Sequence, residues 1–292
     1  MKYAWIEKES DSWPLERVCS VLGVSTSGYN SQRRGGASTK RLSDLQLLTL
    51  IRSIYEESKR AYGSPRILGD LKEIGIPAGK NRVERLMKEN GIKSRVARKF
   101  RLTTDSKHNL PVSPNLLARN FTAERPDQVW TADLTYIWTG ESWLYLAVVL
   151  DLYSRMIVGW SMGERMTRDL VINALRMACM SRRPQPGLLH HSDRGSQYCS
   201  AEYRKVLEEY QMISSMSRKG DCWDNAVTES FFGSLKKESV HGNNFKTRDE
   251  ARKELFSYIE LFYNHKRKHS SLGYRSPAAF YATWLNQNRL AA

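Results

Sequence analysis

The stretch that decides the fold is QVWTADLTYIWTGESWLYLAVVLDLYSRMIVGWSM, residues 128–162. It holds three runs rich in valine, isoleucine, leucine and aromatic residues: VWTADLTYI (129–137), WLYLAVVLD (143–151) and RMIVGWSM (155–162). Short turns separate the runs, at Thr139–Ser142 and Leu152–Ser154. Runs of this composition bounded by turns are typical of strands. The segment therefore predicts three successive β-strands.

Downstream of this segment, helical patterns alternate with short strand-like runs. We expect a helix over about residues 168–181, a strand at GLLHHS (187–192), a helix over about residues 201–210, a strand at MISSM (212–216) and a last helix that carries Glu229. The order βββαβαβα is that of the ribonuclease H-like fold. The sequence thus predicts an α/β fold: a ribonuclease H-like core, with a mixed five-stranded sheet and flanking helices, preceded by small all-α helix-turn-helix domains.

A short helical pair is expected near the N-terminus, over residues 13–34. Pro14 can open a helix through ERVCSVLG without losing a hydrogen bond, and Gly23 can end it. Ser25 or Ser27 can cap a second helix. The tight turn in VLGVSTSGYN is typical of a helix-turn-helix, although plain helical hairpins share it.

A second helical unit ends in a basic helix. Its first helix carries five apolar residues at three-residue spacing, from which we expect one apolar face: Leu42, Leu45, Leu48, Ile51 and Ile54. In the last helix, KNRVERLMKENGI, apolar residues point inward and four basic side chains point outward: Lys80, Arg82, Arg85 and Lys88. Three helices ending in a basic one predict a DNA-reading helix-turn-helix. The alternative is a small bundle with an exposed basic face.

Charge is unevenly distributed along the 292 residues, whose net charge is +15. Residues 1–127 carry a net charge of +10 and residues 224–292 one of +4, against +1 for residues 128–223. A catalytic body flanked by parts that grip nucleic acid would have this distribution. A basic surface that is merely solvated explains the total charge better than it explains the asymmetry.

Several classes of protein are disfavoured by what the sequence lacks. It has no apolar run of membrane-spanning length and no signal-peptide pattern, so we expect a cytosolic location and no membrane partner. The four cysteines are scattered, which indicates neither a disulfide framework nor structural zinc. No phosphate-cradling GxxxxGK[ST] loop is present, so no ATP-driven step is expected.

These patterns divide the chain into five parts. We expect a short helix-turn-helix-like segment, a helical DNA-binding domain, a basic linker, a ribonuclease H-like catalytic core and a C-terminal helical extension: residues 1–37, 38–94, 95–126, 127–240 and 241–292.

Three acidic residues lie at positions that the expected fold would bring close together. Asp133 lies midway along the first strand and Asp193 just beyond the fourth, so pairing of those strands would bring them side by side. Glu229 follows 35 intervening residues later, on a helix begun by Asp224 and Asn225. Three carboxylates brought together repel unless a hard cation lies between them, as in a Mg²⁺ site for phosphoryl transfer. In so basic a chain, the phosphate is expected to be that of nucleic acid.

Four motifs carry a resemblance to a known family: WTADLTY, HSDRGSQY, DNAVTESFFGSLKKE and YNHKRKHSSLGYRSP. The acidic triad, its spacing and the lysine seven positions after Glu229 resemble the DDE transposase and retroviral integrase superfamily. More narrowly, the four motifs together resemble the catalytic second-frame protein of the IS-three group of bacterial insertion sequences. The resemblance extends over nearly the whole chain.

The resemblance implies a function and a site. The chain would be a transposase that nicks element ends and joins them to DNA, with Asp133, Asp193 and Glu229 binding two Mg²⁺ ions, or Mn²⁺, roughly 4 Å apart. Water would attack in end cleavage and a DNA 3′-hydroxyl in strand transfer. Lys236, facing outward, would hold a phosphate near the terminal bases. Gly195 and Gln197 would let DNA approach closely, because glycine lacks a side chain and glutamine is a donor.

The implied partners are double-stranded DNA, both terminal inverted repeats and target, and further copies of the chain as a dimer or higher assembly. An upstream-frame product, separate or fused, is a further implied partner, and the implied location is the bacterial cytoplasm at the nucleoid. Two alternatives remain: a catalytically inactive DNA-binding regulator derived from a transposase, and another ribonuclease H-like nuclease such as a junction resolvase. The intact triad disfavours the first, and the helical front end and Lys236 disfavour the second.

Other polar residues receive structural interpretations. Asp151 could be a fourth acidic ligand, but a salt bridge to Arg155 that closes the strand turn is favoured. His265 and His269 have a spacing that can bind zinc, yet no carboxylate or cysteine is at hand, so a DNA-facing or structural role is favoured. Trp130 is expected in the core.

Overall fold

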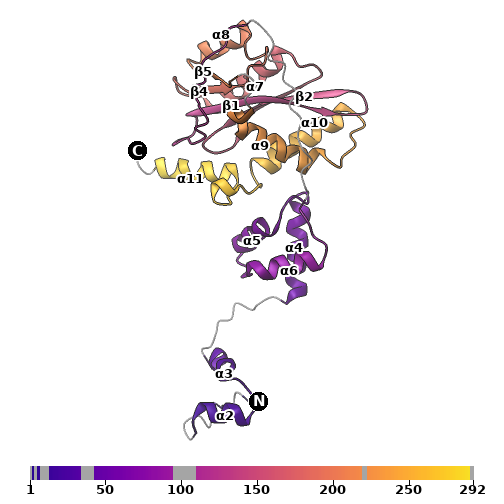
Figure 1. The fold of residues 1–292 in the computed structure, drawn as a ribbon, viewed down its shortest axis with the longest axis vertical. Helices are drawn as coiled ribbons and strands as arrows, with labels where there is room; N and C mark the ends of the chain where they lie inside the picture. The colour runs from indigo at the N-terminus through magenta and orange to yellow at the C-terminus, as the bar shows by residue number, and fades with distance from the viewer. Residues whose placement is uncertain are drawn as a thin grey trace. The chain divides into compact units, whose positions relative to one another are not determined.

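The computed structural model describes residues 2, 5–6, 13–33, 43–94, 110–218 and 222–289. The chain forms two compact units, one made of Met1–Ser53 and Ile67–Ile92 and the other of Ile54–Arg66 and Lys93–Ala292. Figure 1 traces both along the chain, and each is described by itself below. In the described part of the chain, no helix is long and apolar enough to cross a membrane.

The N-terminal helical pair consists of α2 (Leu15–Val21) and α3 (Thr26–Arg33). As predicted, α2 begins directly after Pro14, and Gly23 follows it with a φ of +62°, which a glycine adopts without strain. Val18, Cys19 and Tyr29 form its small buried core with Ile6.

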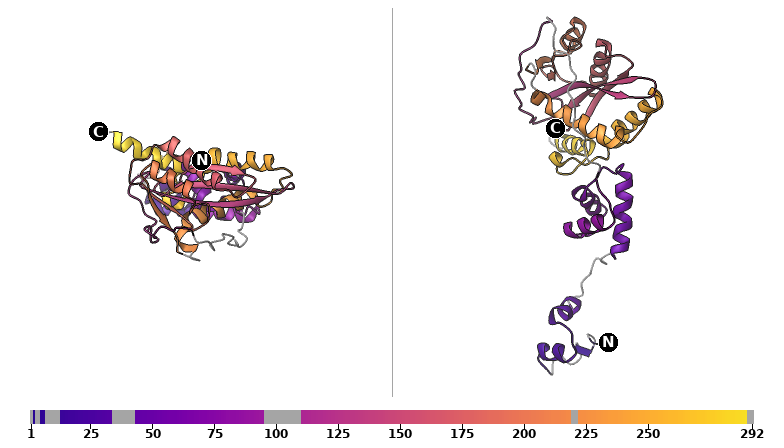
Figure 2. Two further views of the ribbon diagram at one scale, coloured as in Figure 1. Left: turned by 90° about the horizontal axis from the view of Figure 1, so that it is seen from above. Right: turned by 45° about the vertical axis from the view of Figure 1, so that its right-hand side comes forward.

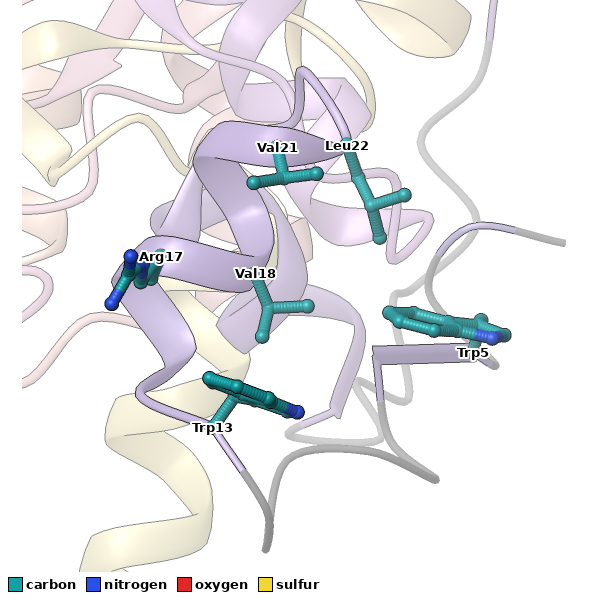
Figure 3. A pocket seen from close by; sticks show the side chains of 6 residues that line it. All are labelled: Trp5, Trp13, Arg17, Val18, Val21 and Leu22. Carbon is teal, nitrogen blue, oxygen red and sulfur yellow. The ribbon is translucent and has the colours of Figure 1, made fainter.

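A shallow apolar pocket opens on this helical pair, as Figure 3 shows. Its volume is about 270 Å³, and two tryptophans at its rim, Trp5 and Trp13, are more than half exposed. The remaining lining comes from α2 and its C-cap residue Leu22, and Arg17 is the one charged lining residue among those described. The described lining of the pocket is thus apolar apart from one guanidinium group.

Three further helices follow: α4 (Asp44–Glu57), α5 (Ser64–Glu73) and α6 (Lys80–Glu89). The apolar face predicted for α4 is wrong in part, because Leu45 is 75% exposed while Leu47 and Ile51 are buried; Leu42 lies outside the described residues. A step of three residues falls short of one 3.6-residue turn, so residues spaced by three drift around the helix and cannot all share a face. In α6 the predicted inward residues, Val83, Leu86 and Met87, are buried.

The second unit contains the predicted mixed five-stranded sheet, in the order β3-β2-β1-β4-β5. Its strands are β1 (Val129–Trp138), β2 (Trp143–Asp151), β3 (Ile157–Gly163), β4 (Leu189–Ser192) and β5 (Ile213–Met216). The first three strands pair antiparallel, and β4 and β5 add in parallel to the other edge of β1. The first strand is therefore central, with neighbours on both sides.

Helices cover both faces of this sheet, as predicted. On one face lie α7 (Arg168–Arg182) and α8 (Ala201–Glu209), and on the other lie α9 (Ala226–Leu235) and α10 (Arg248–Phe256), a layering visible in Figure 1 and in the right-hand view of Figure 2. The α7 side encloses the main core, which includes Trp130 at 0% exposure. The predicted core position of Trp130 is thus confirmed.

The C-terminal part consists of helices and loops, as expected. After α10 come η3 (Ser257–Tyr263), η4 (Ser270–Leu272) and α11 (Pro277–Arg289), while η2 (Lys236–Val240) continues α9 as a π-helical segment. The side-chain amide of Asn264 accepts a hydrogen bond from the backbone N–H of Ile157 and donates one to its carbonyl, both at 3.0 Å. This paired contact satisfies polar backbone groups at the outer edge of β3 and ties the C-terminal part to the sheet.

Candidate active site

Asp133 and Asp193 lie side by side because of the register of two parallel strands. In the pairing of β1 with β4, Ala132 is opposite Ser192. The next residue on each strand is one of the two aspartates. The predicted pairing of the first and fourth strands is thus confirmed, and it places two carboxylates side by side, midway along β1 and just beyond the end of β4.

Backbone N–H groups hold both carboxylates in place. The N–H of Leu134 donates to Oδ1 of Asp133 at 2.7 Å, and the N–H of Gly195 donates to Oδ1 of Asp193 at 2.9 Å. Each carboxylate keeps a second oxygen that can act as an acceptor or ligand. Hydrogen bonds to backbone fix side-chain orientation before any ligand arrives.

The third acidic residue, Glu229, is carried by α9, which is fastened to β1. The hydroxyl of Thr228 donates to the hydroxyl of Thr131 at 2.7 Å, and the amide of Asn225 donates to the carbonyl of Ala132 at 3.3 Å. Phe231 and Phe232 are buried and anchor the helix in the body of the unit. Glu229 itself is half-buried.

The carboxylates are close enough to influence one another. The pKa of Asp133 is raised well above its usual value, chiefly by burial and next by the charge of Asp193, with a smaller effect from Glu229. Burial also raises the pKa of Glu229. Neighbouring carboxylates repel one another when ionised, and a bound divalent cation would offset that repulsion.

The donor chemistry of these residues fits a hard cation, since carboxylate oxygens are the ligands that Mg²⁺ prefers. Within the described ranges, however, no three His, Cys, Asp or Glu side chains are close enough together to hold one ion. The carboxylates therefore share a region without forming a closed ligand set.

Lys236 is turned toward this region, so the outward-facing orientation predicted for it is wrong. Its Nζ lies 5.1 Å from the centroid of the Tyr136 ring, a cation–π distance. Burial lowers the pKa of Lys236 to about 8, and the charge of Asp133 opposes that change. The lysine follows α9 directly, with α-helical backbone dihedrals, at the start of the π-helical segment.

Gly195 and Gln197 lie in the loop after Asp193, but both have partners inside the protein. Gly195 is buried, and its N–H is the donor to Asp193. The side-chain amide of Gln197 donates to the carbonyl of Met166 at 3.2 Å. In this structure Gly195 positions a carboxylate, and Gln197 ties the loop to the segment before α7.

The basic side chains of α6 carry ion pairs. Arg82 and Arg85 both contact Asp44, each at 2.6 Å, and Arg85 also contacts Glu89 at 2.9 Å. The side chain of Arg82 is only 12% exposed, so its predicted outward position is wrong. Lys80, 3.8 Å from Glu84, and Lys88 are exposed as predicted.

One supporting residue was not predicted from the sequence, a buried carboxylate just before α9. Asp224 is fully buried and receives hydrogen bonds from the side chains of Arg218, Arg119 and Asn115. The hydrogen bonds from Arg218 hold the pKa of Asp224 far below its usual value. This cluster fixes the start of the helix that carries Glu229. Its only sequence signal is an acidic residue at the expected helix start.

Asp151 and Arg155 flank the turn between β2 and β3, but their side chains do not pair with one another. The salt bridge predicted between Asp151 and Arg155 is wrong: Asp151 accepts hydrogen bonds from Ser154 and Asp127, and Arg155 donates to the carbonyl of Phe121. The turn is closed by backbone and hydroxyl donors instead of by a charge pair.

His190, His191 and His269 pack against or form hydrogen bonds with other side chains of the protein. His190 and His191 are both buried, and their rings form hydrogen bonds with the hydroxyls of Tyr203 and Ser215 respectively. His269 packs edge-on against Tyr263, which agrees with its structural interpretation, and His265 is exposed.

Models of known families match three parts of the chain. An "Integrase core domain" model matches residues 123–222, a second model of that description matches residues 229–285, and an "HTH-like domain" model matches residues 43–100. The fold and the carboxylate-lined end of its sheet thus define an integrase-type core together with a helix-turn-helix-like domain.

Relatives narrow the class further. The chain is 42% identical over 282 residues to the transposase InsF for insertion sequence IS3A of Escherichia coli (strain K12), covering 96% of this chain and 98% of the relative. It is 50% identical over 263 residues to an uncharacterized 31 kDa protein of insertion element IS600 from Shigella sonnei, covering 90% of this chain and 97% of the relative. The chain belongs to the family of insertion-sequence transposases that includes InsF.

Solved structures of partial similarity include two viral proteins. The integrase catalytic core domain of HTLV-2, in complex with magnesium, is 17% identical and covers 55% of this chain and 99% of that chain, with a TM-score of 0.43. A simian T-cell lymphotropic virus intasome is 14% identical and covers 79% of this chain and 74% of that chain, with a TM-score of 0.46.

Proposed function

We propose that this protein is a DDE-type DNA transposase, which cleaves the ends of an insertion sequence and joins them to target DNA by direct phosphoryl transfer. Asp133, Asp193 and Glu229 are its catalytic carboxylates in this proposal. The observation that carries it is the strand register that sets Asp133 beside Asp193, with the charge of Glu229 near enough to raise the pKa of Asp133. Family membership supports the same reaction class.

The three carboxylates would hold the metal ions of the reaction. Two Mg²⁺ ions, or Mn²⁺, bound there would activate the attacking oxygen and stabilise the leaving oxygen of the scissile phosphate. The attacker is water in end cleavage and a DNA 3′-hydroxyl in strand transfer, so the proposal assigns no protein nucleophile. The N–H groups of Leu134 and Gly195 keep one oxygen of each aspartate engaged and so direct the other.

Lys236 would contact a DNA phosphate close to the reacting end. With a pKa of about 8 it is mostly charged at neutral pH, and its position near Asp133 and Tyr136 puts that charge beside the carboxylates. A cation there would offset the approach of an anionic DNA backbone toward three acidic groups. Gly195 and Gln197 would act from the loop, by close backbone approach and by an amide donor after release from Met166.

The helix-turn-helix-like domain would bind double-stranded DNA through α6. Lys80 and Lys88 are exposed, and Arg82 and Arg85 would exchange the carboxylate of Asp44 for backbone phosphates. Element ends and target DNA are the proposed ligands. Cutting two ends together would require a dimer or higher assembly, and an upstream-frame product is a proposed partner for end recognition.

The proposal is tested with a supercoiled plasmid that carries the DNA flanking the gene. Wild-type protein and Glu229→Gln are incubated with Mg²⁺ or Mn²⁺, each with and without the upstream-frame product. Metal-dependent nicks at defined ends with the wild type alone support a transposase. DNA binding without cleavage in every condition would instead indicate a catalytically inactive regulator.

A further inference from the structure

A basic pocket lies beside α9, on residues to which the proposed chemistry assigns no role. Its volume is about 360 Å³. The helix contributes Ser230 and Ser234, and Ser230 comes directly after Glu229. Further lining comes from the C-terminal motif YNHKRKHSSLGYRSP, through five of its residues: Tyr263, Arg267, His269, Ser270 and Ser271.

Arg267 is held rigidly at this pocket. Its guanidinium makes a two-pronged contact with Glu238, at 2.7 and 2.8 Å, and donates to the hydroxyl of Ser234 at 2.9 Å. The hydroxyl of Tyr258 donates to the same carboxylate at 2.7 Å, and Arg267 is 4% exposed. The remaining nitrogen, Nη1, lies 3.2 Å from Nε2 of His269, so protein groups engage every nitrogen of this guanidinium and it contributes a fixed positive charge.

Two more arginines complete the lining. Arg66 belongs to the same compact unit, lies 5.5 Å from the ring of Tyr62 and approaches Glu238 only to 4.0 Å. Arg155 is fixed by a 3.0 Å hydrogen bond to the carbonyl of Phe121. Among the described residues, neither of these two guanidinium groups has a carboxylate as a hydrogen-bond partner.

The electrostatic field of the pocket is positive. Burial lowers the pKa of Arg66, and the charge of Arg267 lowers it further by more than Glu238 raises it. Burial lowers the pKa of His269 to about 3, and Arg267, Arg66 and Arg155 each add to that change. The one carboxylate bonded to Arg267 therefore leaves an excess of positive charge.

We propose that this pocket binds a phosphate group, through the guanidinium groups of Arg66 and Arg155 and the hydroxyls of the serines around them, beside the fixed charge of Arg267. A guanidinium fork matches the oxygens of phosphate, and serine hydroxyls donate to the remaining ones. If the only role of the motif were to hold the C-terminal part by the pair of Arg267 with Glu238, two further arginines would not be needed at the same cavity. The phosphate can come from a DNA backbone or from free phosphate, because the recognising groups are the same.

The test uses the full chain and three variants. Ser271→Asp adds a negative charge at an exposed lining position, and Ser271→Asn has nearly the same shape without the charge. Gln287→Glu adds the same charge on an exposed part of α11 outside the pocket lining. Circular dichroism checks that each variant is folded.

Calorimetric titration with inorganic phosphate, at constant ionic strength and without divalent metal, measures the binding of free phosphate to the pocket. We expect saturable binding that Ser271→Asp weakens by about tenfold or more, since one added charge lies close to the ligand. Ser271→Asn and Gln287→Glu should stay within about twofold of the wild type.

Fluorescence anisotropy with a labelled duplex, over a range of KCl concentrations in EDTA, measures whether a DNA phosphate occupies the pocket. If a DNA phosphate occupies the pocket, Ser271→Asp reduces the magnitude of the slope of log affinity against log salt concentration by about 0.9, the value for one phosphate. Gln287→Glu leaves this slope unchanged. An unchanged slope with charge-sensitive calorimetric binding assigns the pocket to free phosphate. Absence of both effects overturns the proposal. Glu229→Gln should keep these binding results, so failure of the pocket is distinguishable from failure of the catalytic assignment.

Discussion

The hydroxyl of Thr228 on α9 donates a 2.7 Å hydrogen bond to the hydroxyl of Thr131 on β1, and both residues are fully buried. Glu229 is the next residue on the helix, and Asp133 lies two residues further along the strand. The threonine pair thus sets the spacing between the helix and the strand that carry two of the three carboxylates.

Replacing either threonine alone should lower the free energy of unfolding by more than half of the loss caused by replacing both. Thr228→Val leaves the Thr131 hydroxyl buried without this partner, at about 1–3 kcal/mol, whereas the double replacement with Thr131→Val removes both polar groups. We expect the two single effects to sum to more than the double effect, as measured by urea unfolding. Additive effects would mean that the two hydroxyls do not depend on one another.

Gly159 on β3 should tolerate no side chain. A Cβ at this position would lie 2.2 Å from the carbonyl oxygen of Ala174 and 2.6 Å from the backbone nitrogen of Ala178, both on α7. Gly159→Ala must push α7 away from the sheet, so we expect a loss of about 3 kcal/mol or more in the free energy of unfolding. Gly233→Ala is the matched control, because a methyl group added at this position on α9 meets open space. Equal stability of the two variants would contradict the close packing of α7.

Lys236 should make DNA affinity depend on pH. Its pKa of about 8 means that it is charged below pH 8 and neutral above, so its phosphate contact weakens as pH rises through that value. Affinity for an end-containing duplex, measured by anisotropy in EDTA, should fall more between pH 7 and 9 for the wild type than for Lys236→Arg, which stays charged. Lys236→Ala should bind weakly at every pH. Identical pH profiles for wild type and Lys236→Arg would remove the lysine from the DNA contact.

Asp133 should link stability to pH and to metal. Because its folded-state pKa is raised above the unfolded value of about 3.9, the metal-free protein loses stability as pH rises between those two pKa values. Asp133→Asn removes that penalty and should raise the Tm without metal. Mg²⁺ should raise the Tm of the wild type and have a smaller effect on the variant. A variant stabilised by Mg²⁺ as strongly as the wild type would exclude Asp133 as a ligand.

Much of the fold and the pairing of the aspartates could be predicted, because both follow from local patterns. Strand composition and turn spacing predicted the sheet, and the position of Asp133 within its strand predicted its neighbour Asp193 once those strands were paired. The features that escaped depend on contacts distant in sequence. Asp224 acquires its arginine partners from residues 6 and 105 positions away, and no local pattern encodes such a cluster.

The wrong predictions have specific physical causes. The orientation of Lys236 depends on residues distant in sequence, because its Nζ lies over the ring of Tyr136 and near the charge of Asp133. Arg155 and Asp151 lie close in sequence, but backbone donors satisfy the carboxylate first, so the expected salt bridge does not form. Sequence spacing indicates which groups can meet, and competition among nearby donors decides which of them do.

The most direct test of the central claim is a strand-transfer assay with pre-cleaved element ends, located by the plasmid assay, and Mg²⁺. Asp133→Asn, Asp193→Asn and Glu229→Gln should each lower product formation by at least about a hundredfold, while duplex affinity stays near that of the wild type. Glu208→Gln, an exposed carboxylate on α8, is the matched control and should retain activity. Full strand transfer by any one of the three triad variants would contradict the assignment of the catalytic carboxylates.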